Sequence, residues 1–184
     1  MTVRNPDNVL IGGYRVFIVD DDDGNTSSNT PTKHELGWMS GEAKIEEQAN
    51  STTVKESEGG TVLTIATDKE VHLTFGLLEC NIDTLIMLNP SATAIEGGFA
   101  VGTFQSDKTF TVELWHKKRS GKYLCYRILK GKISGNITMF QINQDNSSPI
   151  SIDIVGLADA SKDTQHNLYE GIECDATDAP GGGW

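Results

Sequence analysis

The sequence lacks the features of a membrane, secreted or disulfide-stapled protein. Its 184 residues include only three cysteines, Cys80, Cys125 and Cys174, which are widely spaced and form no CxxC pair. This excludes zinc-ribbon and thioredoxin motifs and predicts three reduced thiols. No apolar run approaches the ~20 residues of a membrane helix, and residues 1–7 contain no apolar signal segment. We therefore expect a protein made and kept in a cytoplasm, without a membrane partner.

Catalytic and metal-binding patterns are also missing. The histidines lie far apart, without HxH or HExxH spacing, although His72 and His116 both fall on predicted strands. No GxSxG motif or P-loop is present. Residues 20–25 form an acidic run, but an EF-hand loop would place Val19 at its first position and Thr30 at its last. We interpret this run as a solvated loop and predict neither an enzyme nor a metal or cofactor site.

Charge is distributed unevenly along the chain, whose formal net charge is −11. Residues 1–70 carry 13 acidic and 6 basic side chains, and residues 145–184 carry 8 acidic side chains with Lys162 as the one base. Residues 107–132 reverse this balance, with 8 basic and 2 acidic side chains. A basic segment between acidic ones indicates complementary surfaces between subunits. It argues against wrapping of nucleic acid, which needs a broadly basic face.

Alternation of apolar and polar residues dominates the chain and predicts an all-β fold. The clearest case is Val71 to Leu77, in which every second residue is large and apolar. Other strands are predicted at residues 13–19, 42–47, 52–57, 61–66, 95–103, 109–115, 123–129, 133–142 and 150–155, with turns at 58–60, 68–69 and 119–122. This number of short strands predicts a β-sandwich or small barrel with a long hairpin at about residues 42–66.

One short helix is predicted at about residues 82–88. Asn81 is a suitable N-cap, Asp83 lies in the first turn where the helix dipole favours an acid, and Pro90 ends the pattern. The helix has one apolar face and should flank the sheet.

The alternating pattern ends after residue 155, which predicts that the chain consists of a folded domain and an arm. Residues 1–157 form a β-sandwich domain with an N-terminal arm, in which 150–155 is the last strand. Residues 158–184 are polar, acidic and rich in glycine, and we interpret them as a C-terminal arm.

Basic and aromatic residues outside the predicted core suggest surfaces for contacts. Lys117, Lys118 and Arg119 cluster at a predicted hairpin turn, where they serve either solubility or docking to an acidic neighbour. Trp38 follows a glycine in a loop, Trp115 lies opposite the apolar face of its strand, and Trp184 is the last residue. Aromatic anchors are favoured at interfaces. The predicted inter-subunit residues are Trp38, Lys117, Lys118, Arg119 and Trp184.

The order of these motifs resembles the major tail tube proteins of long-tailed bacteriophages. An arm and a glycine-broken strand at residues 6–16 are followed by Leu36-Gly37 and then by the hairpin of residues 42–66. The most specific motif is the strand that leads into the helix, Val71-His72-Leu73-Thr74-Phe75-Gly76-Leu77-Leu78-Glu79-Cys80-Asn81-Ile82-Asp83-Thr84-Leu85. The resemblance covers residues 5–157, and residues 20–33 and 158–184 depart from it.

The resemblance implies a structural subunit of the virion tail, synthesised in the host bacterial cytoplasm. Six copies would form a ring whose inner strands join into one barrel, and stacked rings would form the conduit for DNA ejection. The partners implied are other copies of the chain and the tape measure, tail terminator and distal tail proteins, while DNA passes through the lumen without specific binding. The lumen or stacking residues would include Glu42, Lys44, Glu46, Thr52, Val54 and Glu56.

Other interpretations stay open. Trp38, Trp115 and Tyr123 would suit a lectin-like or other ligand-binding β-sandwich, because aromatic rings stack on sugars. Another tail component or a secretion-system tube protein would share the fold that the resemblance implies. Glycan binding by a monomer would favour the first, and assembly into rings would favour a tube subunit.

Overall fold

The computed structural model describes most of the chain. The described residues are 7, 10–20, 32–55, 61–78, 81–89, 91–103, 109–134, 149–163 and 166–180. The acidic run after Asp20, residues 135–142 of the strand predicted at 133–142, Cys80, Glu56 and Trp184 lie outside them.

Strands dominate the described residues, and one short helix accompanies them, which confirms the all-β prediction. The elements in chain order are β1 Leu10–Asp20, β2 Thr32–Glu35, β3 Met39–Lys55, β4 Thr61–Leu77, α1 Ile82–Leu88, β5 Ala92–Ile95, β6 Gly98–Val101, β7 Phe110–Lys118, β8 Tyr123–Ile133, β9 Ile150–Leu157 and β10 Tyr169–Cys174. No helix in these parts of the chain is long and apolar enough to cross a membrane.

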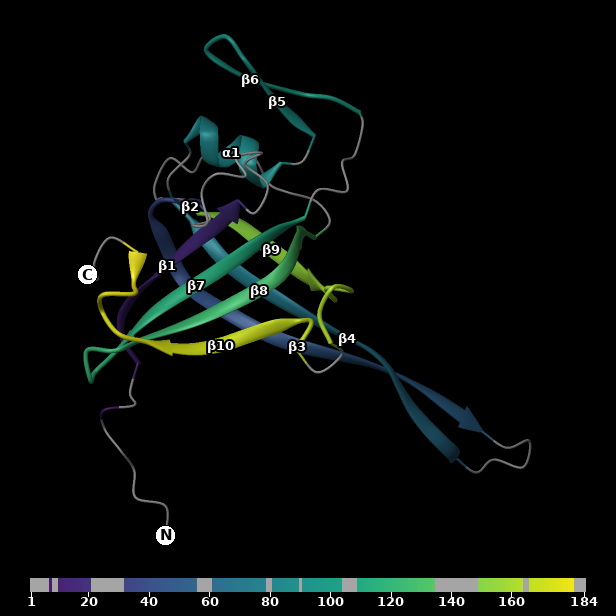
Figure 1. Ribbon diagram of the computed structural model, residues 1–184. Coiled ribbons are helices and arrows are strands. Elements are labelled where there is room, and N and C mark those ends of the chain that lie inside the picture. Colours follow the sequence, from purple (N-terminus) through teal and green to yellow (C-terminus); the bar gives the residue numbers. More distant parts are fainter. Residues whose placement is uncertain are drawn as a thin grey trace.

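Eight of the strands belong to one antiparallel sheet, which bends at β8. The order of the strands is β2-β1-β7-β8-β9-β4-β3. One edge of β8 pairs with β7, and the other edge is shared, because residues 123–128 pair with β10 and residues 130–133 pair with β9. The two halves of the sheet therefore cross and face each other, with β1, β7 and β8 over β9, β4 and β3 (Figure 1).

One hydrophobic core fills the space between the two halves. Alternation places every second residue of β9, and of β4 from Val71 to Leu77, in this core, as the sequence predicted for Val71 to Leu77. The buried residues are Val16, Ile18, Leu36, Val71, Leu73, Phe75, Leu77, Leu88, Phe110, Val112, Leu114, Ile128, Ile150, Ile152 and Ile154. Each such side chain contributes about 1.5–3 kcal/mol when it leaves water.

Helix α1 forms as predicted. Its bounds are Ile82–Leu88, and the Asn81 side chain accepts a hydrogen bond from the Asp83 N–H at 2.9 Å. This contact satisfies one of the N–H groups that a helix start leaves without an intrahelical partner. Leu85 and Leu88 are buried, so α1 covers one end of the core (Figure 1).

The turn predicted at residues 68–69 is wrong. β4 continues without interruption from Thr61 to Leu77, and its partner β3 is equally long. A register shift replaces the turn, because Asn50 pairs with Asp68 while Ser51 pairs with Ala66. The extra residue on β4 forms a β-bulge, which absorbs the break in the apolar pattern without ending the strand. The long hairpin predicted at about 42–66 is confirmed and is longer than expected.

Residues 150–155 are not the last strand. Tyr169–Cys174 form β10, which pairs with β8 from Tyr123 to Ile128. The division of the chain at residue 157 stays a prediction, but the segment interpreted as an arm contributes a strand to the sheet. The strand predicted at 95–103 is also two strands, since β5 and β6 form a small separate hairpin with Glu96-Gly97 at its turn.

Two glycines make the bend at β8 sterically feasible. Gly131 of β8 pairs directly with Gly156 of β9. A Cβ atom on Gly156 would lie 2.4 Å from Val71 Cγ1 and 2.8 Å from Ile128 Cγ2, and one on Gly131 would lie 2.9 Å from Ile154 Cγ2. Side chains from both halves of the core therefore occupy the space that a larger residue would need.

We expect Gly156→Ala to lower the free energy of unfolding by about 1–3 kcal/mol, because overpacking forces Val71 and Ile128 to move. Guanidinium denaturation followed by circular dichroism measures this loss. Gly98→Ala in β6 is the matched control, because no heavy atom lies within 4 Å of the added methyl group. Equal denaturation midpoints for the two variants would contradict the steric account of the bend.

Candidate functional site

The β3–β4 hairpin extends beyond the body of the molecule (Figure 1). β4 pairs with β9 only over residues 71–77, so no described strand covers that edge of β4 from Thr61 to Glu70. β3 is the last strand of the sheet, and its outer edge has no partner among the described strands. The distal hairpin, which we define as residues 51–55 and 61–66, therefore presents two open edges. Open edges of this length are templates for pairing with another chain.

The side chains of the first half of β3 alternate as predicted. Ala43 and Ile45 pack against the core, while Glu42, Lys44 and Glu46 are exposed on the opposite face. Lys44 and Glu46 form an ion pair of 2.7 Å on that face. Their assignment to a lumen stays a prediction. The side chains of Thr52 and Val54, and the whole of Glu56, lie outside what the structure describes.

Acidic groups from neighbouring strands share this outward face. His72 of β4 is flanked by two carboxylates, with Asp153 Oδ1 3.2 Å from its Nδ1 and Glu70 Oε2 3.9 Å from its Nε2. The register aligns Glu46, His72, Val155 and Lys132 across β3, β4, β9 and β8. The face on which Glu42, Lys44 and Glu46 lie is therefore continuous over four strands. The sequence analysis did not identify the residues of β4 and β9 that belong to this face.

Trp38 is exposed, as expected for an interface residue. Its relative accessibility is 75%, the highest among the exposed large apolar side chains. It borders a depression of about 490 Å³ that Tyr14, Arg15, Glu35 and Met39 also line. This depression lies where β1 and the start of β3 approach each other, since Tyr14 Oη donates a hydrogen bond to Ser40 O at 3.4 Å.

The basic cluster at residues 117–119 has an acidic partner within the same chain. Lys118 donates a hydrogen bond to Glu173 of β10, and Lys122 lies 3.4 Å from the same carboxylate and 3.8 Å from Asp175. Lys117 lies over the ring of Tyr123, 5.8 Å from its centroid. Docking to a neighbour stays a prediction for this cluster, but its complementary acidic surface includes the chain's own C-terminal segment.

Trp115 and Tyr123 are not surface aromatics, contrary to the expectation for a sugar-binding site. They are 2% and 1% exposed and form a second buried cluster with Phe17, Cys125 and Ala179. This cluster lies on the face of β1, β7 and β8 opposite the core, and the segment after β10 covers it. Of the three aromatic residues proposed to stack on sugars, only Trp38 is accessible.

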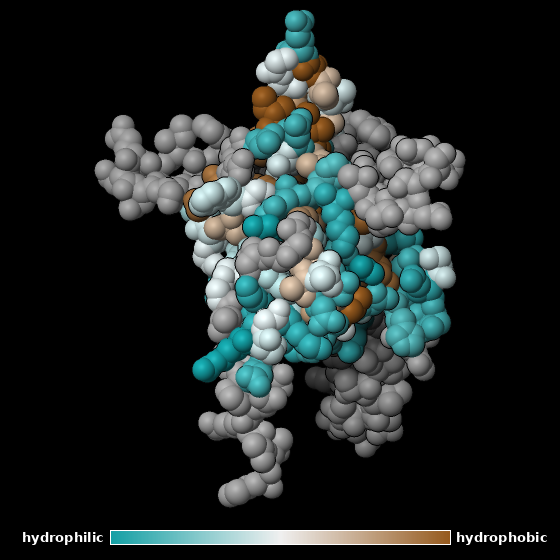
Figure 2. Space-filling view, turned by 60° about the vertical axis from the view of Figure 1, so that its left-hand side comes forward, coloured by the Kyte–Doolittle hydropathy of each residue, from teal (hydrophilic) through white to brown (hydrophobic). Residues whose placement is uncertain are grey.

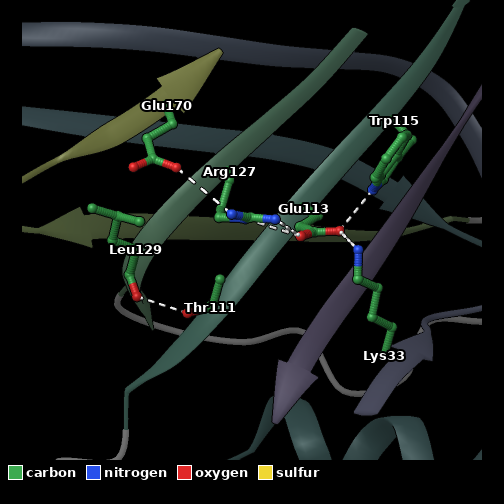
Figure 3. Close-up of polar contacts among 7 residues, drawn as sticks. All are labelled: Lys33, Thr111, Glu113, Trp115, Arg127, Leu129 and Glu170. Atoms are coloured by element: carbon green, nitrogen blue, oxygen red, sulfur yellow. Dashed lines mark hydrogen bonds and ion pairs between the residues drawn. The ribbon is translucent and has the colours of Figure 1, made fainter. Parts of the chain in front are cut away.

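A buried carboxylate organises the polar contacts of the same face. Glu113 is 1% exposed. One of its oxygens accepts hydrogen bonds from Lys33 Nζ and Trp115 Nε1, both at 2.8 Å, and the other accepts from Arg127 Nε at 3.0 Å and Nη2 at 2.8 Å (Figure 3). Arg127 Nη1 also lies 3.7 Å from Glu170. This Glu113 network ties together β2, β7, β8 and β10.

The Glu113 network was missed by the sequence analysis. Glu113 is the one acid on β7, and it lies two residues from Trp115, which was a usable signal. Its partners Lys33 and Arg127 lie on β2 and β8, far apart in the sequence, and only the order of the strands in the sheet brings them together. Burial alone would raise the pKa of Glu113, but the hydrogen bonds from Lys33, Trp115 and Arg127 outweigh it and hold that pKa below its usual range.

Thiols and histidines form no cluster of recognisable chemistry in the described residues. Burial raises the pKa of Cys125 to about 12, so this thiol stays protonated at neutral pH. No described group of three or more His, Cys, Asp or Glu side chains is arranged to hold a metal ion. The Nδ1 atom of His116 is buried without a hydrogen-bond partner among the described residues.

We expect Glu113→Gln to lower the free energy of unfolding by about 1–3 kcal/mol at pH 7, because Lys33 and Arg127 lose their shared counter-charge. The depressed pKa of Glu113 means that its carboxylate stabilises the fold above about pH 4.5 and that this contribution is lost as pH falls further. Denaturation between pH 7 and pH 3 should therefore give a flatter profile for the variant.

Glu35→Gln is the matched control for this prediction, since it removes an exposed ion pair with Arg15 on the neighbouring strand. Exposed pairs contribute about 0–1 kcal/mol. Equal losses of stability for the two variants would show that the Glu113 network has no special role.

Comparison with known proteins does not assign the chain to a family. No protein-family model matches the sequence, and no curated protein matches it with significance. The resemblance to tail tube proteins rests on the short motifs of the sequence, above all residues 71–85. The function is therefore inferred from the two features that the fold exposes, the open strand edges and the projecting hairpins.

Proposed function

We propose that this chain is the structural subunit of a phage tail tube, and that its copies join through strand edges into rings that stack around a channel for DNA. The observation that carries this proposal is the β3–β4 hairpin. Its two 17-residue strands extend past the sheet with open edges. A soluble monomer gains nothing from such edges, which favour aggregation. A closed ring of subunits would pair them and remove them from solvent.

The outward face of β3, β4 and β9 is suited to a channel wall. It carries Glu42, Glu46, Glu70 and Asp153 against Lys44. Lys130 and Lys132 extend this face on β8, which leaves an excess of one carboxylate over the lysines. An excess of carboxylates repels DNA phosphates, which lets a genome slide without sticking. Repeated around a ring, the small excess of each subunit would add up to a negative channel.

The cellular context follows from the same proposal. The subunit would be synthesised in the bacterial cytoplasm and would function in the virion tail, next to the tape measure, tail terminator and distal tail proteins. By its resemblance, each ring would contain six copies. The basic cluster at residues 117–119 and Trp38 remain candidates for contacts within or between rings.

Negative-stain electron microscopy of the purified protein tests this proposal. We expect rings or tubes with a central channel at high protein concentration. Particles that stay monomeric at every concentration and salt condition would contradict it.

A variant with a shortened hairpin sharpens the test. Replacing residues 51–67 by Asn-Gly joins Asn50 to Asp68 through a two-residue turn and keeps the part of β3 and β4 that packs on the core. We expect this variant to unfold at the same temperature as the wild type but to form no tubes. Tubes of normal length from the shortened variant would show that the distal hairpin is not needed for assembly.

A further inference from the structure

An exposed tryptophan stands beside a depression in which charged and aromatic side chains meet. Trp38 is 75% exposed, and the depression next to it has a volume of about 490 Å³. This volume lies within the range of small-molecule sites, about 300–1,000 Å³. Tyr14 and Arg15 of β1, Glu35 of β2 and Met39 of β3 complete the lining. Residues from three strands therefore converge on one site.

The backbone around Trp38 is held in place on both sides. Leu36 is fully buried, and its N–H donates a hydrogen bond to Val16 O at 3.0 Å. Gly37 follows with a φ of 102°, a conformation that favours glycine. The next side chain is exposed, while Trp38 O accepts a hydrogen bond from the Leu78 N–H at 2.8 Å. A large ring on a fixed backbone is a preorganised contact surface, because binding then costs little conformational entropy.

An ion pair supplies polar groups to the depression. Arg15 Nε lies 3.3 Å from Glu35 Oε1, and the two side chains keep 36% and 41% of their accessibility. A guanidinium only donates hydrogen bonds, and a carboxylate only accepts them. Side by side, the two groups match a ligand whose neighbouring hydroxyl groups both accept and donate. The pair has no net charge, so it gives no advantage to an ionic ligand.

The depression differs in character from the apolar surface of the molecule. Hydrophobic residues line the β5–β6 projection at the top of the molecule, whose strands contain no charged residue (Figure 2). The depression instead combines an exposed ring with an ion pair, and the net charge of −11 on the chain disfavours an anionic ligand. These properties fit a neutral sugar, whose apolar face stacks on an aromatic ring while its hydroxyl groups bind polar side chains.

We propose that the depression beside Trp38 binds one ring of a neutral sugar. The sugar stacks on the indole of Trp38, and two neighbouring hydroxyl groups bind the Arg15 guanidinium and the Glu35 carboxylate. Trp115 and Tyr123 are buried and add no second stacking surface, so each site binds weakly. In an assembly of many copies, weak sites of this kind reinforce one another. The inference goes beyond the proposed tube function and does not depend on it.

Saturation-transfer difference NMR on the full chain tests this site, because it detects weak binding to monomers and to large assemblies alike. The ligands are maltose, lactose and N,N′-diacetylchitobiose, with glucuronate as the anionic counterpart. Trp38→Ala removes the stacking ring, and Glu35→Gln removes the charged acceptor while keeping the size of the side chain. Leu157→Ala is the control, because it shortens an exposed apolar side chain of β9 outside the depression. All three positions are exposed, so the fold should be retained.

We expect the wild type to transfer saturation to the ring protons of at least one of the three disaccharides and not to glucuronate. Trp38→Ala should lower this transfer at least about tenfold, and Glu35→Gln should lower it about fivefold. Leu157→Ala should behave like the wild type.

Two results would overturn the inference, namely no transfer from the wild type to any of the three disaccharides, or equal transfer from the wild type and Trp38→Ala. Equal transfer to glucuronate would overturn the assignment to neutral sugars. Each of these results leaves the tube function intact, because electron microscopy scores tubes separately. A chain that binds sugar through Trp38 and never forms tubes would contradict the tube function and support the sugar site.

Discussion

The contact between Gly131 and Gly156 is the constraint on which the arrangement of the sheet depends. Where β8 meets β9, side chains of Val71, Ile128 and Ile154 converge, and a Cβ atom on either glycine would lie under 3.0 Å from one of them. The absence of side chains allows β8 to leave β10 and pair with β9 within a few residues. This change of partner turns one sheet into two facing halves, and the core forms between them.

The bend also decides which edges are covered. One half of the sheet is covered on its outer face by the segment after β10, which buries Trp115 and Tyr123. The other half ends in β3, whose outer edge is open in the described structure. Along residues 42–46, charged side chains protect that edge from indiscriminate pairing, while residues 51–54 carry no charge. The uncharged stretch ends at Lys55, so under the proposed function residues 51–54 would be the part of this edge least protected from association with another copy.

The sequence predicted local structure better than long-range structure. Asn81, Asp83 and Pro90 predicted the bounds of α1 from the sequence, because the signals that begin and end a helix are local. Strand alternation identified the buried faces of β4 and β9 for the same reason. Asp68 was misread as a turn, since a bulge and a turn share polar residues and differ only in what the partner strand does. The burial of Trp115 and the contacts of Glu113 depend on other segments, namely β10 with the residues after it, and β2. The residue pattern within a single strand cannot reveal such contacts.

Charge segregation along the chain acquires a different meaning once the strands are placed. The basic segment at residues 107–132 suggested complementary surfaces between subunits. In the structure much of it meets acids of the same chain, because Lys118 and Lys122 contact Glu173, and Arg127 contacts Glu113 and Glu170. The basic side chains that form these ion pairs hold β10 on β8. They could bind a neighbouring subunit only if β10 were first released. Under the proposed function, contacts between subunits would therefore fall to the open strand edges and the distal hairpin.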